Sequence, residues 1–259
     1  MGLELDGKRA IVTGGGTGIG YAIAEELVRE GARVAIAGRR REVLDGAAKL
    51  IKESTGADVL AVPADTGDED SVRNLVDTVQ AAFGGVDILV NNAAEQPAQK
   101  GPSFNDADDE WFHRQINVKV IGYLRTIKAV APLLIENGWG RIINISGTGA
   151  RSTVSVIGSV RNASVIALTK NVADELGPHG INVTTVHPGP TRTDRYIELR
   201  QARSADGSAL LPAPNNVIGR VIEPREVAWV VAFLASPRSV AITGDNVFAG
   251  GGVPGSIYY

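Results

Sequence analysis

RAIVTGGGTGIG, residues 9–20, is the stretch that decides the fold. A short run with β-branched side chains, residues 9–13, leads directly into a glycine-rich turn, and an amphipathic helix follows over residues 19–29. Glycines let the backbone turn tightly and approach a pyrophosphate, whose charge meets the free N–H groups at the start of a helix. A glycine match alone would also fit a plain tight turn, but the strand–turn–helix order predicts a dinucleotide-binding site.

Strand-like runs alternate with amphipathic segments along the whole chain. In the first helix Ile19, Ala22, Ile23 and Leu27 fall on one face, and Gly31 follows where a left-handed residue is needed. The alternation predicts an α/β fold over residues 1–259, a single doubly wound Rossmann-type domain with a seven-stranded, mostly parallel sheet and helices on both faces. The expected strands are 9–13, 33–37, 59–62, 86–90, 141–145, 181–186 and 245–248. Residues 93–105 and 190–222 are expected to be long irregular segments.

Composition narrows the function classes. The net charge of −3 argues against a nucleic-acid-binding face, and no run approaches the ~18 apolar residues of a membrane span. The start of the chain lacks a signal-peptide pattern, so a cytoplasmic location is expected. The chain has no cysteine, which excludes thiol chemistry and zinc–thiolate sites. Its three histidines, His113, His179 and His187, lack metal-ligand spacing, so no metal site is predicted.

Three arginines follow the second predicted strand, in AGRRR, residues 37–41. A site selective for NAD usually offers Asp or Glu there to the ribose 2′-hydroxyl, whereas arginine can hold a 2′-phosphate. Arg39 is the best placed of the three. The sequence therefore favours NADP(H) over NAD(H), although a solvated, basic helix start is the alternative.

Further motifs follow the glycine turn at spaced positions. They are ADT (64–66), NNAA (91–94), INVKVIGYL (116–124), RIINIS (141–146), HPGPTRT (187–193), EPREV (223–227), FLAS (233–236), TG (243–244) and GG (250–251). Together with TGGGTGIG they resemble the patterns of the short-chain dehydrogenase/reductase family over almost the whole chain. The resemblance implies a small-molecule substrate, hydride transfer with a nicotinamide dinucleotide, and a substrate lid at 190–222. The cofactor-binding residues that it implies are Gly14, Thr17, Gly18, Ile19, Gly20, Arg39, Asp65, Thr66, Asn92, Ala93, Pro188, Gly189 and Thr191.

The chain departs from this family on its catalytic helix, which should carry Tyr-x-x-x-Lys. In GSVRNASVIALTK, residues 158–170, the closing LTK places the tyrosine position at Gly158 and the lysine position at Asn162. The position of the family's serine most resembles Gly147, with Ser146 beside it. The remaining catalytic candidates are Asn117, which fits the asparagine of the family's proton relay, Ser146 and Asn162.

The absent tyrosine is the residue that protonates the carbonyl oxygen in this family. A positioned general acid contributes about 10²–10⁴-fold, whereas holding reactants in register reaches effective molarities of about 10⁵–10⁸ M. The sequence therefore predicts an NADP(H)-dependent reductase of an activated carbonyl or related small molecule, with non-standard proton donation. The candidates for a substitute proton donor are Tyr196, His187, Glu95 and water. Ordinary structural roles for the three residues are the alternative: a lid residue, a hydrogen-bonded strand-end histidine and a solvated loop residue.

Several other polar residues near these motifs are expected to be structural. Arg161 and Arg151 are predicted to be outward helix charges, with a clamp for a substrate anion as the alternative. Tyr123 is predicted to be a buried helix residue. Lys170 lies about two helical turns beyond Asn162, too far to replace the family's lysine. His113, His179, Tyr258 and Tyr259 are also assigned structural roles.

Two other functions remain open at this point: a cofactor-binding pseudoenzyme that pairs with an active relative, and a non-redox dehydratase, isomerase or cyclase that reuses the pocket.

In the family, the catalytic helix, which corresponds to the region around residues 158–170 here, packs against a neighbouring subunit. Residues 163–167 (ASVIA) are apolar on more than one side, which favours a homo-oligomer, a tetramer or a dimer, over a merely well-buried helix.

Overall fold

Short apolar strands form one sheet in which all neighbours pair in parallel. The computed structural model describes residues 2–95, 108–153, 155–205 and 216–255. The strand order is β3-β2-β1-β4-β5-β6-β7. The strands are β1 (Arg9–Thr13), β2 (Arg33–Gly38), β3 (Leu60–Pro63), β4 (Ile88–Asn91), β5 (Gly140–Ile145), β6 (Ile181–Pro188) and β7 (Asn246–Ala249). All seven predicted strands are present, and the fold class is confirmed.

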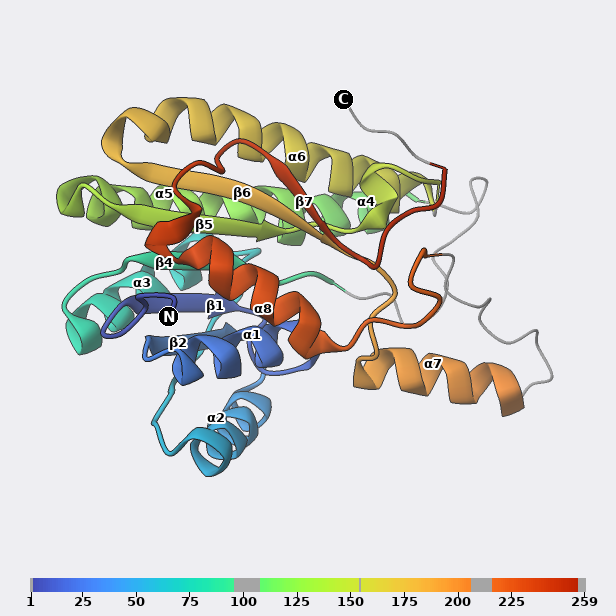
Figure 1. Cartoon of the computed structure of the whole chain (residues 1–259), viewed down its shortest axis with the longest axis horizontal. Helices are drawn as coiled ribbons and strands as arrows, with labels where there is room; N and C mark the ends of the chain where they lie inside the picture. The colour runs from blue at the N-terminus through green and yellow to red at the C-terminus, as the bar shows by residue number, and fades with distance from the viewer. Residues whose placement is uncertain (1, 96–107, 154, 206–215, 256–259) are drawn as a thin grey trace.

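Helices connect the strands and cover both faces of the sheet (Figure 1). They are α1 (Gly18–Arg29), α2 (Arg41–Thr55), α3 (Glu69–Phe83), α4 (Asp109–Ile116), the π-helical η1 (Asn117–Ile121), α5 (Gly122–Asn137), α6 (Val156–Leu176), α7 (Asp194–Ala205) and α8 (Pro224–Ala235); short 3₁₀ turns η2 (Thr148–Ala150), η3 (Gly177–His179) and η4 (Pro237–Ser239) follow β5, α6 and α8. Among the described residues, none of the helices is long and apolar enough to span a bilayer.

Alternate residues of each strand serve two separate cores. On one face, Val12 and Val90 pack with α1, α2 and α8, whereas on the other Ile11 and Leu89 pack with α3, α5 and α6. This is the pattern of a sheet buried on both faces. Because β1 lies between β2 and β4, the connections leave it in opposite directions, and this switch point opens a crevice at the carboxyl ends of the strands.

The segment 190–222 is not wholly irregular, which corrects the prediction. α7 lies within it and stands away from the sheet, at the lower right of Figure 1. Thr193 caps this helix, because its Oγ1 accepts a hydrogen bond from the backbone N–H of Tyr196 at 3.2 Å. The helix is polar and lacks an apolar stripe, so periodicity could not reveal it. Of the segment 93–105, the structure describes only residues 93–95.

A chain of buried side-chain hydrogen bonds ties α5 and α6 to the sheet. Thr126 of α5 donates to Asn91 (2.6 Å), Asn91 donates to Asn144 (2.9 Å), and Asn144 donates to Thr169 of α6 (2.9 Å). Thr185 of β6 donates to the same Thr169 hydroxyl at 2.7 Å. All five residues are buried. These buried hydrogen bonds therefore fix the positions of α5 and α6 relative to the sheet.

Replacement of Asn144 by alanine is expected to lower the free energy of unfolding by about 2–4 kcal/mol, because it leaves Asn91 and Thr169 with unsatisfied buried groups. Asn171→Ala is the matched control: Asn171 is exposed on α6 and donates only to the carbonyl of Ala167. Its effect should stay within about 0.5 kcal/mol. Urea unfolding at a fixed protein concentration measures the free energy of unfolding of both variants. Equal effects of the two substitutions would show that the series of buried hydrogen bonds adds no stability.

Candidate functional site

The glycine turn between β1 and α1 has no room for side chains. Gly14 has φ +64, and a Cβ there would lie 2.8 Å from Asn92 Nδ2. A Cβ on Gly20 would overlap the carbonyl of Gly14. Thr17 precedes α1 without a side-chain cap, so it leaves the first N–H groups of that helix for another acceptor. The turn therefore has the shape that a pyrophosphate needs.

Asn92 holds this turn in place from the end of β4. Its Nδ2 donates to the carbonyls of Thr13 (3.2 Å) and Gly14 (3.1 Å). In return, Thr13 Oγ1 accepts from the backbone N–H groups of Asn92 (3.0 Å) and Ala93 (3.1 Å). Asn92 thus belongs to the predicted site as a support for the turn, while Ala93 lines the cavity beside it.

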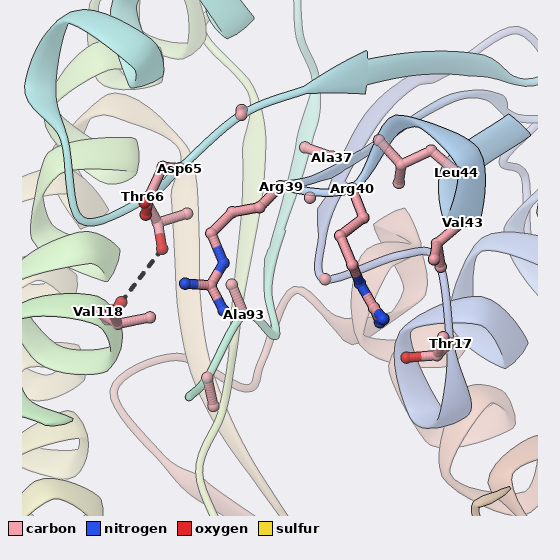
Figure 2. A pocket seen from close by; sticks show the side chains of 15 residues that line it. Thr17, Ala37, Arg39, Arg40, Val43, Leu44, Asp65, Thr66, Ala93 and Val118 are labelled. Atoms are coloured by element: carbon pink, nitrogen blue, oxygen red, sulfur yellow. Dashed lines mark hydrogen bonds between the residues drawn. The ribbon is translucent and has the colours of Figure 1, made fainter. Parts of the chain in front are cut away.

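An open cavity lies along the turn (Figure 2). Thr17 lies at one end, and Asp65 and Thr66 lie at the other, at the carboxyl end of β3. Figure 2 shows the guanidinium group of Arg39 between Thr66 and Ala93. The Arg40 side chain extends toward Thr17.

The three arginines differ in how they are held. Arg41 forms an ion pair with Asp45 at 2.9 Å on the outside of α2. Neither Arg39 nor Arg40 forms a hydrogen bond or an ion pair with the described part of the chain, and both line the cavity. Two guanidinium groups therefore remain available to an anion in this cavity.

Hydrogen bonds join the cavity wall formed by Asp65 and Thr66, together with the adjoining Gly67, to η1. Asp65 Oδ1 accepts from the backbone N–H of Gly67 at 2.8 Å, and Thr66 Oγ1 donates to the carbonyl of Val118 at 3.3 Å. The amide of Asn117 donates to the carbonyl of Gly67 at 3.1 Å. Asn117, predicted to serve a proton relay, thus has its side chain on the Gly67 turn, and its role in the relay stays a prediction.

The strand end at Pro188 and Gly189 crosses the C-terminal glycines closely, because a Cβ on Gly189 would lie 2.8 Å from the Cα of Gly250. Thr191 is buried and bonds the carbonyl of Gly189 at 2.9 Å. Thr193, which the sequence analysis did not select, faces the glycine turn instead: its methyl group is 3.1 Å from the position of a Cβ on Gly18. The available signal was its position as the final threonine of the motif HPGPTRT, residues 187–193.

At the start of α6, the position of the family's tyrosine carries no proton-donating side chain. Gly158 and Asn162 are both buried there. The Asn162 Nδ2 lies 3.1 Å from the Cβ position of Gly147, and its Oδ1 has no hydrogen-bond partner in the described structure. Ser146 is buried, and its hydroxyl donates to the backbone carbonyl of Asn162 at 3.1 Å. A buried acceptor without a partner is costly, so Asn162 Oδ1 fits a donor supplied by a ligand.

Lys119 is a functional candidate that the sequence analysis missed. It is 5% exposed, and its Nζ donates to the carbonyl of Ser146 at 2.9 Å. Burial, to which the positive charge of Arg161 adds, lowers the pKa of Lys119 to about 7. Its only sequence signal was a lysine between the apolar residues Val118 and Val120 on a predicted helix.

Arg161 does not point outward, which corrects the prediction. Its Nη1 donates to the carbonyl of Glu95 at 3.2 Å and to Oε1 of Gln115, and its buried Nε has no partner in the described structure. Burial lowers the pKa of Arg161, although the Tyr123 hydroxyl and the Glu95 carboxylate oppose that change. Glu95 is partly buried and faces the Gln115 amide at 3.5 Å, so it is not a freely solvated loop residue.

The remaining candidates mostly have ordinary roles. His187 is buried between the Gly147 carbonyl (3.1 Å) and Asn246 (3.2 Å), and burial lowers its pKa. Tyr123 is fully buried, as predicted; its hydroxyl donates to the Ile145 carbonyl at 2.9 Å, and burial raises its pKa. Tyr196 is partly exposed on α7. Lys170 is exposed and paired with Asp174 at 2.8 Å.

Arg151, His113 and His179 are exposed. Tyr258 and Tyr259 lie outside the described residues.

Known proteins resemble this chain over nearly its whole length. A family model described as Enoyl-(Acyl carrier protein) reductase matches residues 14–254. The 3-oxoacyl-(acyl-carrier-protein) reductase FabG of Vibrio harveyi is 34% identical over 97% of this chain and 99% of its own. The peroxisomal 2,4-dienoyl-CoA reductase of Danio rerio is 35% identical over 96% of this chain and 82% of its own.

Among solved structures, L-sorbose reductase from Gluconobacter frateurii in complex with NADPH and L-sorbose has a TM-score of 0.89 at 28% identity, covering 99% of this chain and 100% of that one. The family match, the curated relatives and the shared architecture lead to one conclusion. The chain belongs to the short-chain dehydrogenase/reductase family of oxidoreductases.

Proposed function

We propose that this chain is an NADP(H)-dependent reductase of an activated carbonyl or a related conjugated small molecule, and that it works without the family's tyrosine. The observation that carries the proposal is the cavity at the glycine turn, where the Arg39 and Arg40 guanidinium groups are free of ion pairs with the described chain. A related solved structure was obtained with NADPH, which supports the same cofactor here.

The residues present fit a nicotinamide dinucleotide. Gly14 and Gly20 keep side chains away from the turn where the pyrophosphate would lie, and Thr193 borders that turn. The unpartnered Oδ1 of Asn162 fits a ribose hydroxyl, although an amide carries none of the charge of the family's lysine. When bound, the reduced cofactor supplies a hydride.

The NADP(H) preference rests on charge. The 2′-phosphate adds an anion that NADH lacks, and guanidinium groups bind phosphate oxygens through charge-assisted hydrogen bonds. Arg39 projects into the part of the cavity between Thr66 and Ala93, while Arg40 extends along the side toward Thr17. A 2′-phosphate between the two arginines would satisfy both.

Arg39→Ala is expected to weaken NADPH binding about 10–100-fold and to leave NADH binding within about threefold, since it removes a hydrogen bond to a charged group. Fluorescence titration with each reduced cofactor measures both constants. Arg41→Ala is the matched control, because Arg41 already pairs with Asp45. An equal loss for NADH, or no loss for NADPH, would contradict the assignment of Arg39.

The substrate class follows from the absent acid. With glycine at position 158, the substrate must spread the negative charge that hydride addition produces, or take its proton from another source. Conjugated thioesters and activated carbonyls do this, whereas a simple aliphatic ketone does not. Two matches support a conjugated substrate, since the family model is described as an enoyl reductase and one relative is a 2,4-dienoyl-CoA reductase.

The purified protein is expected to oxidise NADPH with conjugated enoyl or dienoyl thioesters or activated carbonyls, and not with simple aliphatic ketones. In the double variant Gly158→Tyr/Asn162→Lys, aliphatic ketone reduction should rise about 10²–10⁴-fold, because the general acid returns. Asn162→Lys alone, which lacks the acid, is the control, and circular dichroism checks that each variant folds. Tight NADPH binding without oxidation by any member of the panel would favour the pseudoenzyme that pairs with an active relative.

We further propose that the chain forms a homo-oligomer through α6. Val156 and Val160 are 53% and 40% exposed, and the exposed Ala163 and Ala167 continue the same helical stripe. A contiguous apolar stripe on a surface helix marks a contact between proteins. The family's packing of this helix against a second subunit supports the same occupant.

Val160→Asp is expected to shift the mass measured by light scattering toward a smaller species, because it places a charge inside the apolar stripe. Ala57→Asp, at an exposed position away from α6, should leave the mass unchanged. A wild-type protein that is monomeric at micromolar concentration would contradict the oligomer.

A further inference from the structure

The amine of Lys119 is buried beside Ser146 and has no counter-ion among the described residues. Lys119 projects from η1, and its single hydrogen bond within the described residues goes to the Ser146 carbonyl. No carboxylate of the described chain lies within ion-pair distance of it. The charge that affects its pKa is the guanidinium of Arg161, which is also positive. A buried ammonium with one acceptor is expensive to maintain, so structural need does not explain it.

Lys119 and Asn162 meet at the same two residues. Ser146 accepts the Lys119 amine on its carbonyl, and its hydroxyl donates to the carbonyl of Asn162 at 3.1 Å. The Asn162 side chain borders Gly147. The space around residues 146–147 is therefore bounded by Asn162 from α6 and by Lys119 from η1. Asn162, at the position of the family's lysine, and the buried Lys119 therefore both lie next to residues 146–147.

We propose that Lys119 supplies from η1 the amine that the family's lysine supplies from position 162, and that Lys119 sets the charge and holds the transferable proton of this site. The inference rests on the proposed reductase function and adds to it a named proton source. Lys119 is a positioning and proton-holding residue, because the structure shows it on the Ser146 carbonyl rather than on a substrate.

Four charged or titratable groups lie around Lys119 or its neighbours, and of these Arg161 acts on its pKa. Arg161 faces it from α6, His187 bonds Gly147 from β6, Tyr123 bonds Ile145 from α5, and Glu95 bonds Arg161 from the segment after β4. Burial and Arg161 both favour the neutral amine. With its pKa at about 7, Lys119 is an ammonium below neutral pH and a free amine above it. The charge of the site therefore falls by one as pH rises through 7.

The proposed proton step is balanced. As hydride bonds to the substrate carbon, the electron pair of the carbonyl moves onto oxygen. That oxygen takes a proton from one water molecule, which in turn takes a proton from the Lys119 ammonium, so an N–H bond breaks and an O–H bond forms. The neutral amine then takes a proton from solvent. An amine with a pKa near the working pH is suited to this exchange.

The first test does not depend on activity. In protein labelled with ¹³C-lysine, the Lys119 Cε resonance, assigned by its loss in Lys119→Met, should titrate near pH 7. The Lys170 resonance is the internal reference, because the hydrogen bond and charge of Asp174 raise its pKa above the ordinary value. Titration of Lys119 at its ordinary value of about 10.4 would overturn the proposal.

The second test measures the charge at the cofactor. Oxidised nicotinamide is positive and the reduced ring is not, so an ammonium at position 119 penalises NADP⁺ more than NADPH. The ratio of the Kd for NADP⁺ to that for NADPH should fall about three- to tenfold in the wild type between pH 6 and pH 8.5. In Lys119→Arg this ratio should stay at the value that the wild type has at pH 6, and in Lys119→Met it should stay at the value that the wild type has at pH 8.5. In Lys170→Met the ratio should change with pH as it does in the wild type.

Rescue completes the design. Lys119→Met/Asn162→Lys returns an amine from α6, and it should restore the rate of NADPH oxidation lost in Lys119→Met, together with a pH-dependent ratio of affinities. A flat ratio in the wild type, or a pH dependence that persists in Lys119→Met, would overturn the proposal even where NADPH binds tightly. Absence of NADPH binding would instead remove the proposed function itself.

Discussion

The buried chain of hydrogen bonds from Thr126 through Asn91 and Asn144 to Thr169 is the constraint on which the site depends. It joins α5 and α6 to the strands β4 and β5 between them. Buried amides are tolerated only when their partners are in place, so neither helix can slide without breaking the chain. Residues 146–147 consequently stay fixed between η1 and α6, where Lys119 and Asn162 reach them.

The sequence predicted the strands and the glycine turn because short-range rules control both: β-branched runs, helix periodicity and the glycine backbone. It could not predict which polar residues are buried. Arg161 is covered by Gln115 of α4 and by the segment after β4, contacts that span 46 and 66 residues of chain. Lys119 is buried for the same reason. Burial depends on tertiary packing, and a charged residue on a helix is by default assumed to be solvated.

The two halves of the candidate site differ in how closely they resemble the family's pattern. Around Gly14 and Asn92 the glycine turn has the expected shape and is held by a hydrogen bond from the end of β4, while Arg39 lines the cavity beside it. Around Gly147, Gly158 and Asn162 three side chains that the family uses are reduced or replaced. Positioning of the reactants contributes more to a rate than a general acid does. Under the proposed function, the first half would therefore supply the larger catalytic effect, and the missing tyrosine would restrict the substrates rather than abolish the reaction.

Electrostatics links the two halves. In the family, a lysine on α6 supplies a positive charge; here Arg161 and, below neutral pH, the Lys119 ammonium place cations in the same region, while the Tyr123 hydroxyl and the partly buried Glu95 carboxylate oppose the lowering of the Arg161 pKa. Two buried cations without close carboxylates cost free energy that neither packing nor ion pairing returns. Groups kept at such a cost, with shifted pKa values, are typical of functional sites. An anionic or electron-rich ligand would return part of that free energy on binding.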